Sequence, residues 1–599
     1  MEKPNKYFVT ICSILVIAIL WLSGKPKDLQ GDLWRFKMFV ECGANLDKYI
    51  DKEMHLGISS IKSLVSANDT VYRLETANTG HYLDYKFYLY PVRLLDVPVD
   101  ACSNKSPLLV NSVDLETHAE FLSDYNEQYA VDDGHVLFSI SPLVAVENSG
   151  TSIIKSILLF VLVNLLLLVV GYLIVLNTEI GSFLKLLLAP LVGYTILNVV
   201  SMILLLLTGE LAAFTTVGLL VLGCAGLVAF NRSLVTSELT KLKQGFLSMF
   251  KLEALQNLGS SSRLMLLLTV LSFGICLLHI LFRPIWAGDG LAFWMMKADI
   301  IFNVGLDFSW GLQNEYPIFW SQFFSVFYGL NGSINHVLAK WYIIIELLLV
   351  YGFIWQFTKG LNSRTRVFFA FIFFPVFGYH WLYSLFAETI VILFFFGFAR
   401  ITMEYLKGNM KLKNYLLLGS IFMVGVGYTK LEGVFQILMI LLPFLVIYRR
   451  VKSKAFIYFS GLAILIVLSL MAWKGFIVDS GWNVSEHAAE TPSIAKVFLI
   501  VDKLFSILGS MSFFTVALVG VFVQFILVRI PSRTSQALLL SIILTWLFSG
   551  VSLIGWETQR IVESAWTAMP RLIWHATPLI IFLSIQLIKD SHIHNNLET

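Results

Sequence analysis

Long apolar segments recur along most of this 599-residue chain, and they constrain its fold more than any other feature. A helix needs about 20 apolar residues to cross the hydrocarbon core of a bilayer. The composition agrees with repeated crossings, because 57% of the residues are hydrophobic, 14% are charged and the mean hydropathy is +0.76. A soluble domain of this size does not have such a composition. The sequence therefore predicts an all-α polytopic membrane protein.

The apolar segments predict about 14 transmembrane helices. The first covers residues 7–23, follows Lys3 and Lys6, and lacks a small-x-small cleavage pattern, so residues 1–23 are predicted to be an uncleaved anchor. The others are predicted at 152–176, 184–207, 211–230, 263–283, 336–358, 367–386, 388–405, 415–429, 433–448, 455–474, 512–529, 535–555 and 571–588.

Residues 24–150 are polar and form the one long interruption between apolar segments. They carry 11 Lys and Arg against 19 Asp and Glu, a net charge of −8, which is typical of a translocated domain. Residues 85–95 and 135–141 have the pattern of strands, and residues 55–66 that of a helix. The sequence predicts a small extracytoplasmic α/β domain. In an oxidising compartment Cys42 and Cys102 could form a disulfide, and two unpaired thiols are the alternative.

Basic residues indicate which loops are cytoplasmic, because Lys and Arg concentrate on that side of a membrane. They cluster in loops 231–263, 359–366, 407–413 and 449–454. All four loops fall on one side if both termini, including the tail 589–599, are cytoplasmic. The opposite face then receives the domain 24–150, segments 284–335 and 475–511, and the turns near Glu388 and Lys430.

Segment 284–335 is predicted to hold two helices that lie along the membrane surface. Counting residues 316–330 as a crossing would invert every later segment and place the basic loops outside. A surface position avoids this conflict. Leu291, Met295, Ala298 and Phe302 repeat at helical spacing, so the same position is expected for the helix after Asp289.

Ionisable groups gather at the predicted outer face, where a functional role competes with simpler structural roles. Asp289 stands between two glycines, and a helix N-cap is the simpler explanation for it. Glu388 lies where one span turns into the next, and Lys430 and Glu432 interrupt an apolar stretch, which could be no more than a polar turn. Arg571 could grip a phosphate or snorkel to the interface. The remaining members of this set are Arg560 and His575, the latter one helical turn after Arg571.

Four motifs in this order make the chain similar to the GT-C superfamily of integral-membrane glycosyltransferases, which includes protein O-mannosyltransferases and aminoarabinose transferases. "DGLAFWMMKAD" followed by "EYPIFW" resembles the family's W-D-x-x-x-Y-W…YP signature, "LFAETIVILFF" its second acidic motif, "YTKLEG" its T-K-N-E-G turn, and "PRLIWHATP" its Arg-bearing last helix. Trp286 is displaced from Asp289, Glu388 replaces Asp and Leu431 replaces Asn. The resemblance covers about residues 263–588, leaving 151–262 as additional helices and a basic loop.

The resemblance implies transfer of a sugar from a polyprenyl-phosphate donor, dolichyl or undecaprenyl, to a glycan, lipid or protein acceptor on the extracytoplasmic face, with inversion. It implies catalytic roles for Asp289 and Glu388. It implies that the donor's lipid phosphate is bound by Lys430, Arg571 and His575. Supporting roles fall to Trp294, Lys297, Tyr316, Glu432 and Arg560.

A divalent cation, Mg or Mn, is left open by the resemblance, with Asp289 and Glu388 as its candidate ligands. Two carboxylates are few for such a site, so no cofactor is assigned. The short loops favour a bacterial inner (plasma) membrane. The net charge of +3 and the absence of a long basic tract argue against nucleic acid as a partner.

Three other functions are compatible with parts of this pattern. A transporter or flippase of lipid-linked sugars would use the same charges along a path, and would also need polar groups at mid-membrane. An O-antigen ligase or polymerase would share the donor and depend on Arg and His. A binding or scaffold protein would owe its role to the acidic domain 24–150.

Overall fold

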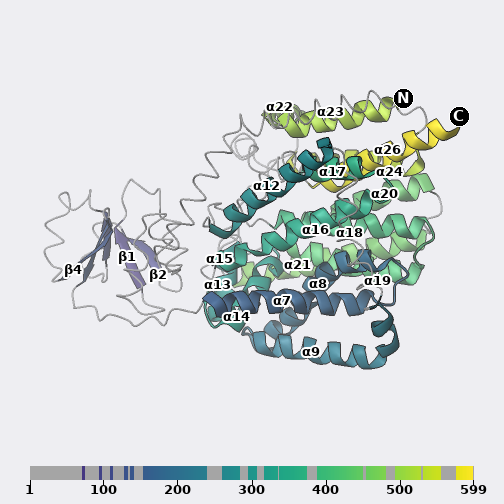
Figure 1. Cartoon of the computed structure of the whole chain (residues 1–599). Helices are drawn as coiled ribbons and strands as arrows, with labels where there is room; N and C mark the ends of the chain where they lie inside the picture. Colours follow the sequence, from purple (N-terminus) through teal and green to yellow (C-terminus); the bar gives the residue numbers. More distant parts are fainter. Residues whose placement is uncertain are drawn as a thin grey trace.

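The chain forms a bundle of mostly apolar helices and a separate small sheet (Figure 1). The computed structural model describes residues 70–74, 93–97, 108–111, 127–132, 135–139, 153–238, 240, 260–282, 294–306, 316–334, 336–373, 387–448, 453–480, 493–510, 512–527, 531–554 and 575–597.

The sheet is mixed and five-stranded. Its strands are β1 (Thr70–Leu74), β2 (Arg93–Val97), β3 (Leu108–Asn111), β4 (Glu127–Asp132) and β5 (His135–Ser139). They lie in the order β2-β1-β3-β5-β4, with β1 parallel to β2 and β3, and β5 antiparallel to β3 and β4. The strand predicted at 135–141 is confirmed as β5, whereas the one predicted at 85–95 shares only its end with β2. The predicted helix 55–66 lies outside the described residues.

Six helices among the described residues are long and apolar enough to cross a membrane. They are α7 (Ile153–Val175), α8 (Ser182–Thr208), α9 (Ala213–Phe230), α18 (Glu388–Leu406), α20 (Leu431–Tyr448) and α21 (Ser453–Asp479). Large apolar side chains such as Phe230, 91% exposed, and Leu207, 77% exposed, stand on their outer surfaces. Water does not favour such a surface, whereas lipid does. The prediction of a helical membrane protein is confirmed.

Further helices among the described residues overlap the remaining predicted spans, and three of them lie instead in segments 284–335 and 475–511, where no span was predicted. They are α12 (Ser260–Phe282), α13 (Met296–Val304), α14 (Phe319–Asn331), α15 (His336–Lys340), α16 (Tyr342–Phe357), α17 (Ser363–Phe373), α19 (Leu412–Thr429), α22 (Ile494–Ser510), α23 (Ser512–Leu527), α24 (Arg533–Ile554) and α26 (Thr577–Leu597). The anchor predicted at 7–23 lies outside the described residues.

The two helices predicted at the membrane surface are present as α13 and α14, but α14 is enclosed by other helices. Nearly all of its side chains are buried, including the rings of Trp320 and Phe324. Aromatic side chains occur on several sides of this helix. At a membrane surface only one side would contact lipid, and the other aromatic side chains would be exposed to water. Contacts with α7, α8, α9, α13 and α19 cover them.

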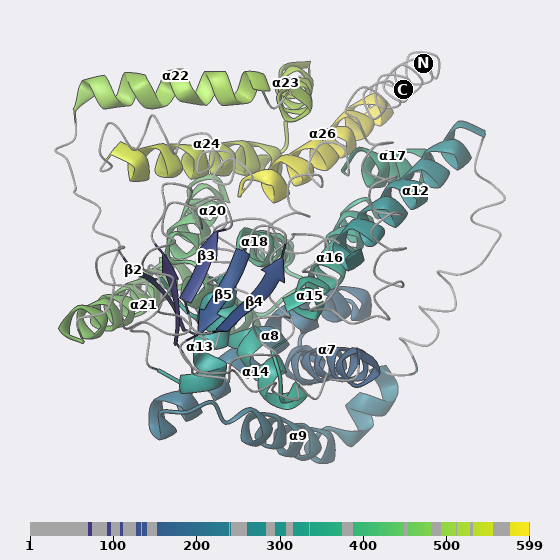
Figure 2. The same ribbon diagram turned by 90° about the vertical axis from the view of Figure 1, so that its left-hand side faces the viewer.

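Helix α22 is the element that most resembles an interfacial helix. Ile494, Val497, Phe498 and Val501 follow a helical spacing and are exposed on one side of it. Lys496 lies on another side and is buried. Figure 2 shows α22 running alongside α24, at the margin of the bundle. An exposed apolar face of this kind is typical of a helix that contacts lipid.

Helices α7 and α8 pack at very close range. A Cβ added at Gly171 would lie 1.8 Å from the Ala189 carbonyl oxygen, and one added at Gly193 would lie 2.0 Å from the Leu167 carbonyl oxygen. Small residues at such crossings allow helix backbones to approach in a membrane, where dispersion contacts replace the hydrophobic driving force. These glycines therefore set the close approach of α7 and α8, two of the helices against which α14 packs.

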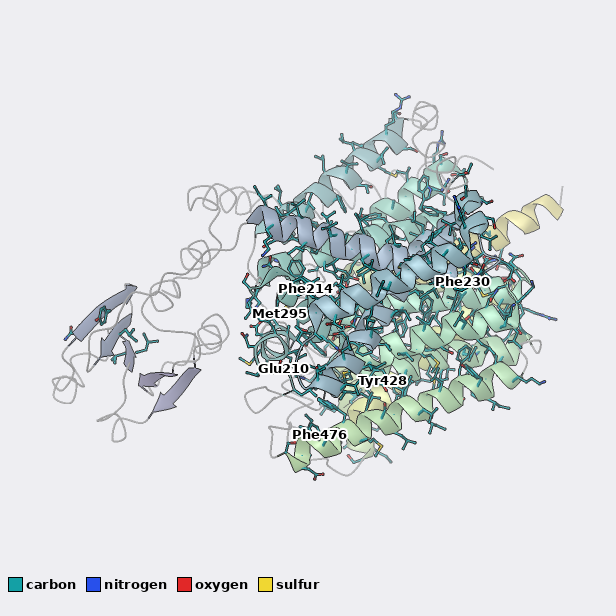
Figure 3. The ribbon with its side chains drawn as sticks, turned by 90° about the horizontal axis from the view of Figure 1, so that it is seen from below. Glu210, Phe214, Phe230, Met295, Tyr428 and Phe476 are labelled. Carbon is teal, nitrogen blue, oxygen red and sulfur yellow. The ribbon has the colours of Figure 1, made fainter. Side chains whose placement is uncertain are left out.

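The helix termini converge at two opposite ends of the bundle. We call one of them the Lys430 end. There, Lys155 of α7 donates a hydrogen bond to the backbone carbonyl of Asn331 of α14 at 3.0 Å, and Ser156 donates one to its side-chain oxygen at 2.9 Å. At the other, the Lys589 end, Lys589 Nζ lies 2.9 Å from the Phe357 carbonyl oxygen. Figure 3 shows Met295, Tyr428 and Phe476 toward one end and Phe230 toward the other.

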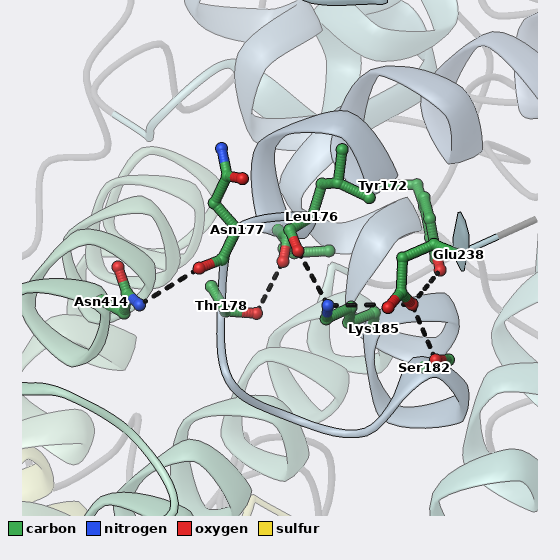
Figure 4. A network of polar contacts seen from close by, with 9 residues as sticks. Tyr172, Leu176, Asn177, Thr178, Ser182, Lys185, Glu238 and Asn414 are labelled. Carbon is green, nitrogen blue, oxygen red and sulfur yellow. Dashed lines mark hydrogen bonds and ion pairs between the residues drawn. The ribbon is translucent and has the colours of Figure 1, made fainter. Parts of the chain in front are cut away.

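Glu238 anchors the beginning of the basic loop 231–263 at the turn between α7 and α8 (Figure 4). Its carboxylate accepts hydrogen bonds from Ser182 at 2.7 Å and Tyr172 at 3.3 Å, and the Lys185 ammonium lies 3.8 Å away. Lys185 also donates to the Leu176 carbonyl at 2.8 Å. This network closes the Lys589 end on the side of α7 and α8.

Candidate functional site

Three charged side chains meet at the Lys430 end. Lys430 Nζ lies 2.8 Å from Oε1 of Glu388 and 3.1 Å from Oε1 of Glu432. Exposure of the side chains is 10% for Lys430, 7% for Glu388 and 28% for Glu432. The sequence predicted all three as site residues, and the structure brings them together. We call this group the Lys430 cluster.

Local backbone geometry explains how the Lys430 cluster forms. Lys430 ends α19 in an extended conformation, with φ −156° and ψ 119°, and α20 begins at the next residue. Glu388 and Glu432 stand in the first turns of α18 and α20, where the unpaired N–H groups and the helix dipole favour a carboxylate. The first turns of α18 and α20 therefore hold the carboxylates, and the break between α19 and α20 holds the ammonium group.

A second group at this end surrounds Lys297 with aromatic rings. The Lys297 ammonium lies 5.8 Å from the ring centroid of Trp294 and 5.7 Å from that of Tyr316, and its side chain is fully buried. The two rings meet edge to face, with centroids 6.1 Å apart. Rings at this distance stabilise a cation through their quadrupoles. We call this group the Lys297 cage, and all three members were predicted as supporting residues.

An aromatic contact connects the cage to the Lys430 cluster. Phe319, three residues after Tyr316, stacks on Tyr428, two residues before Lys430, with ring centroids 5.1 Å apart. Tyr428 is also hydrogen-bonded to Ser469 of α21 at 2.5 Å. Segments more than 100 residues apart in the sequence therefore pack against each other at the Lys430 end.

His575 lies deeper than its predicted role suggests. It is fully buried, and its ring packs edge to face against Phe395 of α18, with centroids 5.9 Å apart. Phe395 follows Glu388 by seven residues, which is about 10 Å along a helix. His575 therefore stands beside the same helix as Glu388, roughly two turns farther into the bundle.

A buried carboxylate beneath the cluster escaped the sequence-based prediction. Glu346 of α16 is fully buried, and neither of its oxygens has a hydrogen-bond partner among the described residues. It acts electrostatically on Tyr194, whose hydroxyl lies 3.1 Å from Oγ1 of Thr429, the neighbour of Lys430. The signal was available, because an acid inside an apolar segment points to a functional role by default.

A buried acid–imidazole pair was also missed. Both carboxylate oxygens of Asp299 lie 2.9 Å from Nε2 of His336, so the pair joins α13 to α15. Asp299 is fully buried. The residues are 37 positions apart, and sequence spacing alone does not indicate their contact.

Five predicted residues lie outside the described part of the chain. They are Asp289, Arg560, Arg571, Cys42 and Cys102. In the ranges that the structure describes, no group of three or more His, Cys, Asp and Glu could hold a metal ion. Oε1 of Glu388, the other candidate ligand, lies 2.8 Å from the Lys430 ammonium. The described residues therefore do not fit a metal, and we assign no step to one.

The described residues supply carboxylates, an ammonium group and aromatic surface at one end of a membrane bundle. Carboxylates can accept a proton or orient a hydroxyl group, an ammonium group can offset negative charge, and rings can pack on a sugar or prenyl group. Comparison of the chain with models of known protein families, with curated proteins and with solved structures finds no match.

Proposed function

We propose that this protein is a GT-C-like glycosyltransferase of the membrane, which transfers a hexose or related sugar from a polyprenyl-phosphate donor to an acceptor at the Lys430 end. The observation that carries the proposal is the contact of Lys430 with both Glu388 and Glu432. An ammonium group between two carboxylates, at a membrane boundary and beside a cage of aromatic rings, is the type of site that a sugar and a lipid phosphate require.

The reaction proposed is a direct displacement. The acceptor hydroxyl oxygen bonds to the anomeric carbon as the bond from that carbon to the phosphate oxygen breaks, and its electron pair leaves with the phosphate. The hydroxyl proton passes to a carboxylate, Asp289 with Glu388 assisting. Attack opposite the leaving group inverts the anomeric carbon.

Positive charge must meet the leaving phosphate. We assign this task to Arg571 and Lys430. Lys430 already contacts two carboxylates, so a phosphate would approach it by displacing Glu432, the more exposed partner. Glu388 would remain as the contact that orients the ammonium group. His575 is a weaker candidate because it is buried about two turns from Glu388.

We further propose the finer topology. About 14 spans, with both termini cytoplasmic, would place the Lys430 end outside a bacterial inner membrane, and an α/β domain over 24–150 would stand on the same side. Reporter fusions after residues 310 and 452 should then report opposite sides. The same side for both would contradict this arrangement.

Transport of a lipid-linked sugar is the second candidate. The observation that favours it is Glu346, a buried carboxylate within the bundle, since transporters place ionisable groups along their path. A transporter would move the intact donor across a vesicle membrane. A transferase would release polyprenyl phosphate and leave the donor's side unchanged.

A reconstituted assay tests the proposal. Purified protein in vesicles receives radiolabelled polyprenyl-phosphate sugars, and released polyprenyl phosphate and labelled acceptor are measured. Glu388→Gln and Asp289→Asn should each reduce transfer by at least 100-fold, as expected for a lost catalytic group. Lys474→Gln, an exposed position on α21 at the same end, is the matched control. Full transfer by the two acid variants would overturn the proposal.

A further inference from the structure

Basic side chains from two helices converge at the Lys589 end, around the last turn of α16. The Arg400 guanidinium of α18 lies 5.0 Å from the ring centroid of Phe357, and Lys589 of α26 donates to the Phe357 carbonyl at 2.9 Å. Lys407, just after α18, interacts electrostatically with both Arg400 and Lys589. We call Arg400, Lys407 and Lys589 the basic triad.

The triad carries more positive charge than its surroundings offset. Glu404 pairs with Arg400 at 2.5 Å, and the same carboxylate accepts a hydrogen bond from Asn409 at 2.9 Å. Asp590 is directed elsewhere, toward Ser532 and Ser535. The carbonyls that end α16 contribute a partial negative charge. Among the described residues, one carboxylate and the carboxyl ends of α16 and α18 thus face three cations.

Burial and mutual repulsion lower the pKa of both lysines in the triad. Burial, with repulsion from Lys407 and Arg400, lowers the pKa of Lys589 from 10.5 to about 8. Burial also lowers the pKa of Lys407, with a smaller contribution from Arg400. The Arg400 Nε is buried with no hydrogen-bond partner among the described residues. An anion at this place would relieve the repulsion and accept the free N–H.

An exposed aromatic side chain lies at the same end of α16 as the triad. Trp355, in the same last turn of α16, is 41% exposed, and the Arg366 guanidinium of α17 stacks on its ring at 3.6 Å. Tryptophan is enriched where a protein surface meets the headgroup region of a bilayer. Because Trp355 and Phe357 share the last turn of α16, Trp355 places the triad at the depth of lipid headgroups.

We propose that the basic triad binds the phosphate of an anionic phospholipid, in the leaflet opposite the proposed sugar-transfer site. A phosphate group could also come from a soluble ion. The lipid is favoured because Trp355, exposed in the last turn of α16, marks the headgroup depth at this end of the bundle, and because basic pockets between helices bind anionic headgroups. The site lies at the other end of the bundle from the Lys430 cluster, so it does not depend on the proposed transferase.

Native mass spectrometry of the full chain tests this site. The detergent-purified protein is offered phosphatidylglycerol or phosphatidylcholine, and the retained lipids are counted over a concentration series. The wild type should bind phosphatidylglycerol at least 10-fold more tightly. Removing a cation should cost about fivefold, from about 1 kcal/mol per basic residue near anionic lipid, so Lys407→Gln/Lys589→Gln should nearly abolish the preference.

Three further arms make the result decisive. Lys454→Gln removes an exposed cation at the start of α21, outside the triad, and should keep the preference. Lys407→Arg/Lys589→Arg keeps the charges and should also keep it. Inorganic phosphate at 10 mM should not displace the lipid; displacement would assign the site to a soluble phosphate instead. An unchanged preference in the folded Lys407→Gln/Lys589→Gln protein would overturn the proposal.

Discussion

The ammonium group of Lys430 lies 2.8 Å from Oε1 of Glu388, although these residues are 42 positions apart and belong to different helices. Both side chains are largely buried. The pair therefore joins the start of α18 to the junction of α19 and α20, and its charges depend on each other for compensation.

Removing one partner of this pair is expected to destabilise the protein. Lys430→Met should lower the free energy of unfolding by about 3 kcal/mol, because an unpaired buried carboxylate is costly. The double variant Lys430→Met/Glu388→Leu should lose less than the sum of the single variants, since no charge of the pair is left unmatched. Denaturant unfolding in detergent measures both, and strict additivity would show that the two residues are not coupled.

The Lys297 cage is expected to depend on aromatic rings more than on hydroxyl groups. Tyr316→Phe keeps the ring and should change stability little, whereas Tyr316→Leu should cost about 1–2 kcal/mol of cation–π stabilisation and packing. The difference in thermal unfolding between these matched variants is the measurement. Equal loss in both would indicate that the tyrosine hydroxyl carries the interaction instead.

The crossing of α7 and α8 is expected to reject any added side-chain atom at its closest point. Gly171→Ala would place Cβ against the Ala189 backbone and should reduce folded yield and stability. Gly218→Ala in α9 has open space around it and should be neutral, or stabilising by up to about 1 kcal/mol. Size-exclusion profiles and unfolding curves compare the two. A harmless Gly171→Ala would contradict the crossing geometry.

A rise in pH is expected to affect the stability of the lipid-free protein and its lipid affinity in opposite directions. The unfolded chain holds the Lys589 proton to about pH 10.5, whereas in the folded chain burial, with Lys407 and Arg400, brings its pKa to about 8. The unfolded state thus binds more protons between these values, so the stability of the lipid-free protein should rise with pH in this window.

The bound anion has the opposite requirement, because it pairs with charged Lys589. Phosphatidylglycerol affinity should therefore fall between pH 7 and pH 9, with Glu404, Arg400 and Lys407 as the charged neighbours. Lys589→Arg stays charged throughout and should lose most of this dependence. The same pH dependence in Lys589→Arg would assign the titration to another group.

Much of the fold could be predicted from sequence because apolar length and helical spacing are local properties. They located the six long helices, and also α13 and α14 within segment 284–335. The burial of α14 could not be predicted, because it depends on the packing of α7, α8 and α9, in which Gly171 and Gly193 set the approach of α7 and α8. The sequence around these glycines does not indicate which helix packs against them.

The candidate site shows the same division. Lys430, Glu388 and Glu432 were found because charges at the ends of apolar segments are conspicuous. Trp294, Lys297 and Tyr316 were named because their motifs resemble those of a known family, and their packing around the ammonium group was not predicted. Asp299 and His336 were missed because their contact depends on the path between α13 and α15. Glu346 was overlooked although its place in an apolar segment was a usable sign.

The position of bound polyprenyl phosphate tests the central claim most directly. An electron cryomicroscopy map of the protein in nanodiscs with undecaprenyl phosphate should show the phosphate at the Lys430 end, within reach of Lys430 and Arg571. Lys430→Met should weaken that density, and Lys474→Gln should leave it unchanged. The absence of specific phosphate density at the Lys430 end under saturating lipid would contradict the account, whatever lipid the basic triad holds at the other end.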